Sequence, residues 1–514
     1  MSTHTAPSAR RIHELLQPWV ATQPDHLAVQ DGHCQLTYQQ LWQASVALAQ
    51  LLQTAGVRPG DRVLIVGENC VAACALFLAC SHFDAWACVV NARLSGREIS
   101  QFIAHSGARR VVYLSYVSGD AAAHAQQASA QAWATPVGTL ALGPLQAHAV
   151  PEPCHAAAAE QVAALVYTSG TTGQPKGVML THGNLLFAAH NTRTQRGLTP
   201  ADVVYGVLPM AHVVGLAVQF LGTISAGSSL LLEPRFTPQA AARALREQGV
   251  SLMSGVPALF ARLLAWYQAE GMAVQAPRLR VISVGAAPLT ATLKAQIEQA
   301  MGLPLYNGYG LTETATLVQT TGEGRSDCAV GHPLPGVQVQ LRDRQGHTVA
   351  QGEVGELWVR SPGRMLGYYR NPEATAQVLD SGGWFNTGDL ASQGPDGALH
   401  IAGRSKELII RSGFNVYPIE VEQVINSFAG VLQSAVVGRE VPDNEEVVAF
   451  VETRAGHHVD VAQLMAYLRE HLSPYKLPAE IRVVPAMPAA PTGKILKHLL
   501  KDAARQPQAA EGVA

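Results

Sequence analysis

Apolar runs and amphipathic stretches alternate along the first part of the chain. Short apolar runs of the kind that form buried strands are followed by stretches of about ten residues with helical periodicity. This alternation indicates βαβ units and a parallel sheet. The predicted strands lie at residues 61–66, 86–90 and 110–114, and the predicted helices between them at residues 71–82 and 97–105.

A second series with the same pattern begins after residue 160. The segment before it, residues 121–160, has weak periodicity and predicts a surface excursion or an irregular helix. Between residues 336 and 360 the pattern changes to short alternating runs with Gly and Pro turns, which is typical of antiparallel strands. The predicted strands of the second series lie at residues 163–168, 203–208, 229–232, 250–254 and 280–284, with helices such as 238–248 and 257–267.

A small unit of its own follows Gly403. Its pattern is strand–helix–strand–strand–helix–strand and ends near Lys501, which is about the size of a small α+β domain. The sequence therefore predicts an α/β protein with a large N-terminal domain, residues 1–404, and a small C-terminal domain, residues 405–514.

Composition narrows the class of protein. The 514 residues are 48% hydrophobic and 14% charged, which supplies apolar material for large cores and excludes overall disorder. A net charge of −2 lacks the basic excess of a dedicated nucleic-acid binder. No apolar stretch reaches the roughly 18–20 residues of a membrane span, and residues 1–11 have no apolar signal core. We therefore expect a cytoplasmic protein.

The seven cysteines are odd in number and lack CxxC spacing. Cys70 and Cys74 could share a helix face, but a structural zinc site needs a second pair of ligands. The sequence therefore predicts reduced, buried thiols, as expected in the cytoplasm.

The segment YTSGTTGQPKGV, residues 167–178, carries the clearest chemistry. Its glycines let backbone N–H groups converge, its hydroxyls add donors, and its lysine supplies a point charge for phosphate. The Walker A pattern GxxxxGK[ST] is absent. Apolar strands on both sides argue against a flexible linker, so we predict a polyphosphate-binding loop. Its binding residues are Thr168, Ser169, Gly170, Thr171, Thr172, Gly173 and Lys176.

Four further segments complete a resemblance to the adenylate-forming superfamily of acyl-CoA synthetases, standalone adenylation enzymes and firefly-type luciferases. The five segments occur in the order of that family, and the resemblance covers residues 15–501. The four are NGYGLTET at 307–314, GWFNTGDL at 383–390, GRSKELIIRSGFNVYPIEVE at 403–422 and PTGKILK at 491–497.

The resemblance implies both a fold and a reaction. The large domain is expected to contain parallel or mixed αβα sheets and a small β-barrel, and the small α+β domain is expected to be mobile. A carboxylate attacks the α-phosphate of ATP to give an acyl-adenylate and pyrophosphate. The thiol of coenzyme A then displaces AMP. Such chemistry needs positive charge and hydrogen-bond donors rather than a protein nucleophile.

The resemblance also assigns roles around the triphosphate. Lys494 is expected to reach the α-phosphate and the carboxylate, and Thr312 to donate to the α-phosphate. Glu313 is expected to hold Mg²⁺, because carboxylate oxygens suit that ion, although a helix-capping role is the alternative. Tyr309 is expected to stack on adenine, with a core aromatic as the alternative, and Asn307 to bind the adenine edge.

The base and ribose have further candidates. Gly285, Ala286 and Ala287 follow a predicted strand and are expected to expose backbone to the base, and Gly310 lies beside the tyrosine of the second signature. Asp389 is expected to accept hydrogen bonds from both ribose hydroxyls, with an Asx-turn as the alternative. Arg404 is expected to assist at the ribose or the phosphates.

The hinge signature implies a two-state enzyme. Lys406 stands at the hinge, and the small domain is expected to rotate between the half-reactions. In the second orientation Ser412, Gly413 and Phe414 are expected to line the pantetheine tunnel; an ordinary turn glycine is the alternative for Gly413.

The acyl pocket is expected near residues 210–220, MAHVVGLAVQF. His212 resembles the gate at the pocket mouth, although a buried, hydrogen-bonded histidine is an alternative. The neighbours Val213, Val214, Gly215 and Val218 include no second cation. An unpaired charge in such a pocket is costly, so we predict an aromatic or aliphatic monocarboxylate rather than a dicarboxylate or an amino acid.

Three departures from the family pattern stand out. Asn386 occupies a position where many relatives have a basic residue, which affects a ribose-side or substrate-side contact. Glu407 replaces the more common Asp. The segment 439–451, REVPDNEEVVAFV, is shorter than usual and puts the coenzyme A nucleotide contacts in doubt.

The sequence thus predicts an acid–thiol ligase of the AMP-forming acyl-CoA synthetase type. One alternative is an adenylating enzyme that delivers its acyl group to a carrier protein or an amine. The other is a non-catalytic binding protein on the same fold, against which the intact Lys494, Glu313, Thr312 and Asp389 argue. Relatives suggest a homodimer and control of Lys494 by a lysine acetyltransferase and deacetylase, because acetylation removes the charge that adenylation needs.

Overall fold

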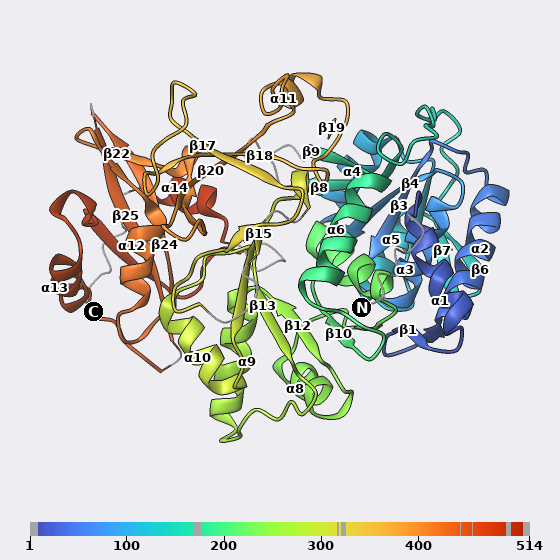
Figure 1. The fold of residues 1–514 in the computed structure, drawn as a ribbon, viewed down its shortest axis with the longest axis horizontal. Helices are drawn as coiled ribbons and strands as arrows, with labels where there is room; N and C mark the ends of the chain where they lie inside the picture. Colours follow the sequence, from blue (N-terminus) through green and yellow to red (C-terminus); the bar gives the residue numbers. More distant parts are fainter. Residues whose placement is uncertain are drawn as a thin grey trace.

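A computed structural model of the chain describes residues 9–168, 176–315, 318–319, 325–442, 444–454, 456–489 and 495–506. Its large sheets are surrounded by helices, and the C-terminal elements lie at the end of the molecule opposite the first strands (Figure 1). The mixed α/β fold with a large N-terminal and a smaller C-terminal part confirms the predicted class.

An eight-stranded sheet contains the first βαβ series. Its order is β19-β9-β8-β4-β3-β5-β7-β6, and β3 pairs in parallel with both β4 and β5. The predicted parallel sheet is therefore confirmed. The strands are β3 (Arg62–Gly67), β4 (Trp86–Asn91), β5 (Arg110–Tyr113), β6 (Gln131–Thr135), β7 (Gly138–Leu142), β8 (Val162–Thr168), β9 (Lys176–Thr181) and β19 (Gly367–Tyr368).

A nine-stranded sheet contains the second series except its first strand, β8, which lies in the eight-stranded sheet. Its order is β16-β15-β14-β13-β12-β10-β11-β1-β2, with a parallel run from β14 to β1. The carboxyl ends of these parallel strands meet at one edge, where ligands of open α/β sheets commonly bind. The strands are β1 (Leu27–Gln30), β2 (Gln35–Thr37), β10 (Val203–Gly206), β11 (Ser229–Leu232), β12 (Leu252–Gly255), β13 (Val281–Val284), β14 (Leu305–Tyr309), β15 (Val318–Gln319) and β16 (His332–Pro333).

The helices follow the expected patterns. Every residue of α3 is buried, as predicted from its unbroken apolar sequence. Thr37, Ser95 and Thr181 each begin a helix with a reciprocal capping box, which satisfies free backbone N–H groups. The helices of this part are η1 (Ile12–Leu16), α1 (Gln17–Thr22), α2 (Tyr38–Thr54), α3 (Val71–Ser81), α4 (Gly96–Ser106), α5 (Gly119–Gln127), α6 (His182–Gln195), η2 (Val214–Leu221), α7 (Gly222–Ala226), α8 (Pro238–Glu247), α9 (Pro257–Ala269), α10 (Ala291–Met301), η3 (Thr312–Thr314) and α11 (Pro372–Ala376).

The prediction for residues 121–160 is wrong in part. After α5 this segment forms the antiparallel hairpin β6–β7, which continues the first sheet beyond β5. Leu140 and Ala141 are buried by this pairing, and Gly138 adopts a positive φ at the turn. These short strands are ordered because β7 pairs with the edge of β5. Such pairing depends on residues far away in the sequence, and local periodicity does not show it.

A four-stranded antiparallel sheet stands where the small barrel was expected. Its order is β17-β18-β20-β21, and it buries Leu357, Val359 and Phe385 on the side of the large core. The two outer strands, β17 and β21, also form isolated antiparallel bridges, Arg342 with Thr348 and Leu399 with Gly331. The strands are β17 (Gln338–Arg342), β18 (Gly355–Arg360), β20 (Phe385–Gln393) and β21 (Leu399–Arg404).

The C-terminal elements build two small cores of their own around the sheet β24-β25-β26. The predicted strand–helix–strand–strand–helix–strand series is present, with an additional strand at its start and an additional helix at its end. The boundary at residues 404 and 405 stays a prediction. The elements are η4 (Ser405–Glu407), β22 (Ile409–Arg411), β23 (Phe414–Val416), α12 (Pro418–Asn426), β24 (Val431–Val441), β25 (Asn444–Thr453), α13 (Val461–His471), η5 (Pro474–Lys476), β26 (Glu480–Val484) and α14 (Lys497–Ala504).

The cysteines agree only partly with the prediction. All seven are free, and Cys70, Cys74, Cys80 and Cys88 are buried. Cys154 is exposed, however, and Cys34 and Cys328 are half-buried. Burial raises the pKa of Cys70 to about 12, so its thiol stays protonated. Across the described ranges, no three metal-ligating side chains gather into a site, and no helix has the length and apolarity to cross a bilayer.

Candidate active site

Three predicted nucleotide residues meet where the second large sheet approaches the antiparallel sheet. Tyr309 ends β14, and its hydroxyl donates to Asp389 Oδ2 over 2.5 Å. Arg404 lies opposite Asp389 in the β20–β21 register, and its Nε is 3.2 Å from Asp389 Oδ1. Burial and the carboxylate raise the pKa of Tyr309, so its hydroxyl remains a donor. The Asp389 carboxylate is thus held from two sides.

The adenine candidates lie at the carboxyl ends of adjacent parallel strands. Asn307 is buried on β14, and its Nδ2 donates to the Cys328 carbonyl over 3.0 Å. Gly285 follows β13, and a Cβ there would lie 3.1 Å from the Gly308 carbonyl oxygen. Ala286 has a φ of 63°, a left-handed conformation that an L residue adopts only under local constraint. Gly285 to Ala287, Asn307 and Gly310 therefore surround one sheet edge.

A residue that the sequence analysis missed, Tyr368, connects the lysine of the glycine-rich segment with Glu313. The Tyr368 hydroxyl donates to Glu313 Oε1 over 2.8 Å. Lys176 Nζ lies 4.8 Å from the centre of the Tyr368 ring. Thr312 and Glu313 form the short helix η3, and Met365 N donates to the Glu313 carbonyl over 2.7 Å. The Tyr368 side chain thus contacts both Lys176 and Glu313, two residues predicted on the phosphate side. No sequence motif marks this tyrosine.

The fit of Glu313 to a magnesium ion follows from its oxygens. Oε1 accepts from Tyr368, while Oε2 has no hydrogen-bond partner among the residues that the structure describes. A carboxylate with one oriented and one available oxygen suits Mg²⁺, which takes few protein ligands and completes its octahedron with phosphate and water.

Six predicted residues cannot be placed. Thr168 and Lys176 are opposite each other in the β8–β9 register and so bracket the loop between them. The loop residues Ser169, Gly170, Thr171, Thr172 and Gly173, and Lys494 of the C-terminal signature, lie outside the described residues.

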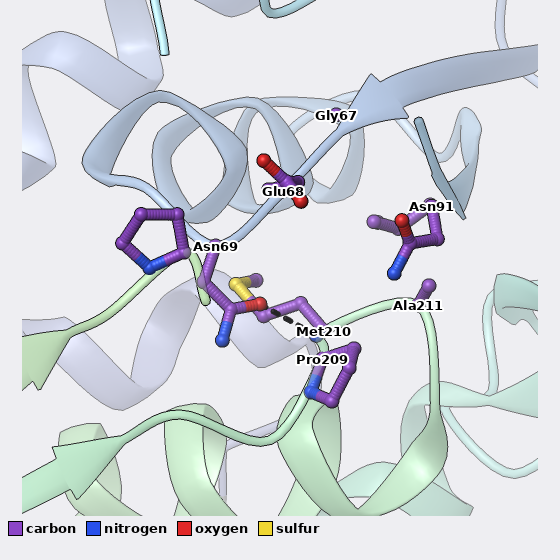
Figure 2. Close-up of a pocket in the computed structure, with 9 residues that line it drawn as sticks. Gly67, Glu68, Asn69, Asn91, Pro209, Met210 and Ala211 are labelled. Carbon is purple, nitrogen blue, oxygen red and sulfur yellow. Dashed lines mark hydrogen bonds between the residues drawn. The ribbon is translucent and has the colours of Figure 1, made fainter. Parts of the chain in front are cut away.

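The loop that carries His212 is fixed by another residue missed by the sequence analysis, Asn69. Asn69 Oδ1 accepts from Met210 N over 2.9 Å, and its Nδ2 donates to the Gly206 and Leu208 carbonyls, each over 3.0 Å. Figure 2 shows Asn69 hydrogen-bonded to Met210 of this loop, and both residues line a small cavity. The contact ties the end of β3 to the segment after β10, and so joins the two large sheets.

His212 itself is a half-buried histidine. Burial, and then the positive charge of Arg93, lower its pKa to about 4, so the ring is neutral near pH 7. A neutral ring at this position is compatible both with a gate and with a core histidine. Its role stays a prediction.

The expected acyl segment forms a π-helix, η2. A π-helix is rare and often marks a functional site, because its wider turn displaces side chains. Gly215 is required here, since a Cβ would collide with the carbonyl oxygens of Leu208 and Pro209.

The neighbours of His212 named above carry no cation, but a half-buried arginine from the preceding helix lies close to η2. Arg196, at the end of α6, and Val218, on η2, line the same cavity. Arg196 Nε is buried and has no hydrogen-bond partner in the described part of the chain, and Nη1 donates to Ser283 Oγ over 2.7 Å. Arg196 precedes His212 by 16 residues in the sequence, so the pattern around His212 does not reveal it.

The hinge and tunnel candidates lie beyond β21. Lys406 is in the short helix η4, directly after Arg404. Ser412 and Gly413 have φ values of 51° and 82° and form the tight turn between β22 and β23. Phe414 is 55% exposed and stacks on Tyr475 with a ring-centre distance of 4.7 Å. An exposed aromatic beside a turn glycine offers an apolar platform on the surface of the small unit.

The departures from the family pattern have local explanations. Asn386 Oδ1 accepts from Gly388 N over 2.9 Å and so supports the turn before Asp389. Glu407 Oε2 lies 3.1 Å from Lys497 Nζ, which also lies 2.7 Å from Glu422 Oε1. Burial opposes the charge of Lys497, but the two carboxylates raise its pKa. This ion pair connects the hinge helix with the helix that follows Lys494.

Comparison with known proteins places the chain in a family. Residues 16–369 match the AMP-binding enzyme family, and residues 420–494 match the AMP-binding enzyme C-terminal domain. The chain therefore belongs to the AMP-binding enzymes, the adenylate-forming ligases.

Individual relatives agree with that class. A feruloyl-CoA synthase from Amycolatopsis sp. is 35% identical over 92% of this chain and 95% of its own length. ATP-bound MatB from Rhodopseudomonas palustris is 30% identical, with a TM-score of 0.82 over 96% of this chain and 99% of that one. The amide bond synthetase McbA from Marinactinospora thermotolerans is 28% identical, with a TM-score of 0.82 over the same shares. The predicted family and the predicted ligase class are confirmed.

Proposed function

We propose that the protein is an ATP-dependent, AMP-forming acyl-CoA synthetase. The observation that carries the proposal is the buried Asp389 carboxylate, 5% exposed, held by Tyr309 and Arg404 beside the sheet edge of Asn307. A carboxylate oriented in this way suits the two adjacent hydroxyls of a ribose. Family membership supports ATP as the nucleotide.

In the first half-reaction, a carboxylate oxygen of the acid forms a bond to the α-phosphorus of ATP, and the bond to pyrophosphate breaks. Asn307, Tyr309 and the Gly285–Ala287 backbone would orient the base, and Asp389 the ribose. Thr312, Lys176 and Lys494 would offer donors and positive charge where negative charge accumulates. Glu313, oriented by Tyr368, would hold the magnesium ion, which neutralises phosphate charge when bound.

In the second half-reaction, the sulfur of coenzyme A attacks the acyl carbon, the bond to the AMP oxygen breaks, and AMP leaves. We propose that Lys406 is the pivot on which the unit 405–514 turns relative to residues 1–404. Ser412, Gly413 and Phe414 would then line the pantetheine tunnel, where the exposed Phe414 ring offers an apolar wall.

For the acid itself we propose an aromatic or aliphatic monocarboxylate, with an aromatic acid favoured by the relative named feruloyl-CoA synthase. His212 would stand at the pocket mouth as a neutral ring, and the π-helix η2 would form one wall. Coenzyme A as acceptor is supported by relatives named as CoA synthases and ligases.

A second candidate is transfer of the acyl group to an amine, which the likeness to an amide bond synthetase favours. Transfer to a carrier protein belongs to the same alternative. We further propose a cytoplasmic homodimer whose Lys494 is acetylated and deacetylated, because loss of that charge would stop adenylation.

The test is a pyrophosphate-release screen over aromatic and aliphatic acids of increasing length. We expect release that depends on ATP and the acid, followed by AMP and a coenzyme A thioester identified by mass spectrometry. AMP formation that ignores coenzyme A but yields an amide when an amine is added would favour the alternative. An absence of pyrophosphate release across the whole panel would overturn the proposed function.

A further inference from the structure

Lys497 lies at a position where its charge does not stabilise its own helix. It is the first residue of α14, and the side chain of the preceding residue, Leu496, is apolar and cannot cap the helix. The N-terminus of a helix carries a partial positive charge, so a cation is favourable at the opposite end instead. The charge of Lys497 is balanced by two carboxylates from other elements. The lysine therefore serves a contact between elements rather than the helix that it begins.

The two carboxylates belong to the hinge helix η4 and to α12. Lys497 Nζ lies 3.1 Å from Glu407 Oε2 and 2.7 Å from Glu422 Oε1. The side chains of Lys497 and Glu422 are only 20% and 9% exposed, so salt screens this contact less than it screens a surface ion pair. Glu422 Oε1 also accepts from Val436 N over 2.7 Å, which fixes the carboxylate to β24. Lys497 thus joins the hinge helix to the sheet of the small unit.

The other end of η4 is attached to the nucleotide side of the site. Arg404, the residue before η4, forms the ion pair with Asp389 and lies opposite it in the β20–β21 register. Leu408 N donates to the Arg404 carbonyl over 3.1 Å and so closes the turn around η4. Two residues separate Arg404 from Glu407 in the sequence. A short helix therefore connects the predicted ribose contact with the carboxylate that Lys497 binds.

The predicted catalytic lysine is close in sequence to the same contact. Lys494 precedes the start of α14 by three residues. Ile495 forms an antiparallel bridge with Ala489, and Leu496 N donates to the Pro488 carbonyl over 2.8 Å. The two ends of the segment that carries Lys494 are thus held together directly before α14. A displacement of the first residue of α14 would displace these ends as well.

We propose that Lys497 is a positioning residue for adenylation. By binding Glu407 on the hinge helix, it sets the place of Lys494 relative to the ribose contact. The inference rests on the proposed function, in which Lys494 serves the first half-reaction. Without the Lys497 contact, η4 and the start of α14 would be connected only through the body of the small unit. The ammonium group of Lys494 would then reach the α-phosphate less often.

The experiment measures the two half-reactions separately in the full-length protein. Adenylation is followed as pyrophosphate release from ATP with the best acid of the panel described above. Thioester formation is followed from the supplied acyl-adenylate of that acid and coenzyme A. We expect Lys497→Met to lower pyrophosphate release about 10-fold or more and to leave thioester formation within about 3-fold of wild type, because a misplacement of about 1 Å can cost up to about 10²-fold.

A second variant removes only the contact with the hinge helix. Glu407→Gln leaves Lys497 paired with Glu422, and it should show the same selective loss of adenylation. The double variant with Lys497→Met should be no slower than Lys497→Met, because both changes remove one shared contact. Lys497→Arg keeps the charge and should recover most of the rate. If Lys497→Met fails to fold, Glu407→Gln tests the same contact by itself.

The matched control is Lys501→Met, about one turn later on α14. Lys501 Nζ lies 3.9 Å from Oε1 of the exposed Glu440, away from the hinge helix. Both half-reactions of this variant should keep the wild-type rate, because its ion pair does not involve η4. A selective loss of adenylation in this control would overturn the inference.

A contact that merely stabilises the small unit would lower both half-reactions equally in the folded Lys497→Met and Glu407→Gln variants, which would overturn the inference. Unchanged pyrophosphate release in these variants would also overturn it, while the proposed function would stand. A wild-type protein that releases no pyrophosphate with any acid of the panel would overturn both.

Discussion

The two sides of the candidate site differ in how their charged groups are satisfied. On the nucleotide side, Asp389 is held by Tyr309 and Arg404, and Glu313 by Tyr368. Near η2, the half-buried Arg196 makes one side-chain hydrogen bond, to Ser283, and pairs with no carboxylate among the residues that the structure describes. The nucleotide is common to the whole family. The side chains that bind it can therefore be held in place by other residues of the protein before it binds. The relatives are named for different acids, so the acyl side is where members of the family differ.

The largest effect is expected from removing positive charge on the nucleotide side. Lys494→Ala should lower the rate of pyrophosphate release by about 10²–10³-fold, because the charge that develops at the α-phosphate loses its partner. Thioester formation from a supplied acyl-adenylate should remain within about 3-fold of wild type. Both rates are measured by quenched flow. Lys501→Ala, on the exposed face of α14, is the control, and unchanged adenylation in Lys494→Ala would show the assigned role to be wrong.

The next effect concerns the preorganised ribose contact. Asp389→Asn should lower kcat/KM for ATP by about 10–100-fold, because charge-assisted hydrogen bonds contribute about 1.5–3 kcal/mol. The KM for the acid at saturating ATP should stay the same, which separates the two sides of the site. Steady-state kinetics with each substrate varied in turn provides the measurement. Asp396→Asn, which removes an exposed partner of Arg325, serves as control. An equal effect on both substrates would mean that the sides are not independent.

A smaller effect is expected from Tyr368, which acts through Glu313. Tyr368→Phe should reduce adenylation about 3–10-fold at low Mg²⁺ and recover at high Mg²⁺, because the carboxylate loses its orientation but not its charge. A magnesium titration of the rate measures this. The adjacent Tyr369→Phe is the matched control, since its hydroxyl donates to Glu152 instead. A defect that magnesium does not relieve would contradict the positioning role.

The smallest effect is expected from His212. Its pKa is lowered to about 4 in the folded protein and is about 6.5 when unfolded. The unfolded chain therefore binds an additional proton between these values, and stability is lost as the pH falls from 6.5 towards 4. His212→Gln should reduce this loss, by at most about 1.4 kcal/mol per pH unit. Urea unfolding at pH 7 and pH 5 measures it, with identical pH dependence in both proteins as the contrary result.

The sequence alone was sufficient to predict most helices and strands and the residues on the nucleotide side of the site. Apolar runs predicted β3, β4 and β8, because a strand buried on both faces needs continuous apolar residues wherever it lies. Local motifs predicted Tyr309, Asp389 and Arg404, and the structure brings these three together. The hairpin β6–β7 was missed, because its order depends on the edge of β5 rather than on its own pattern.

Only the tertiary structure decided which side chains from separate segments share a space. Three side chains that belong to no motif show this. Tyr368 orients Glu313, and Asn69 fixes the loop before His212. Arg196 places a charge beside η2. Periodicity reports whether a position is buried, but the partners of a buried polar group come from elements far away in the chain. Whether a charge is satisfied or left for a ligand is therefore determined by packing.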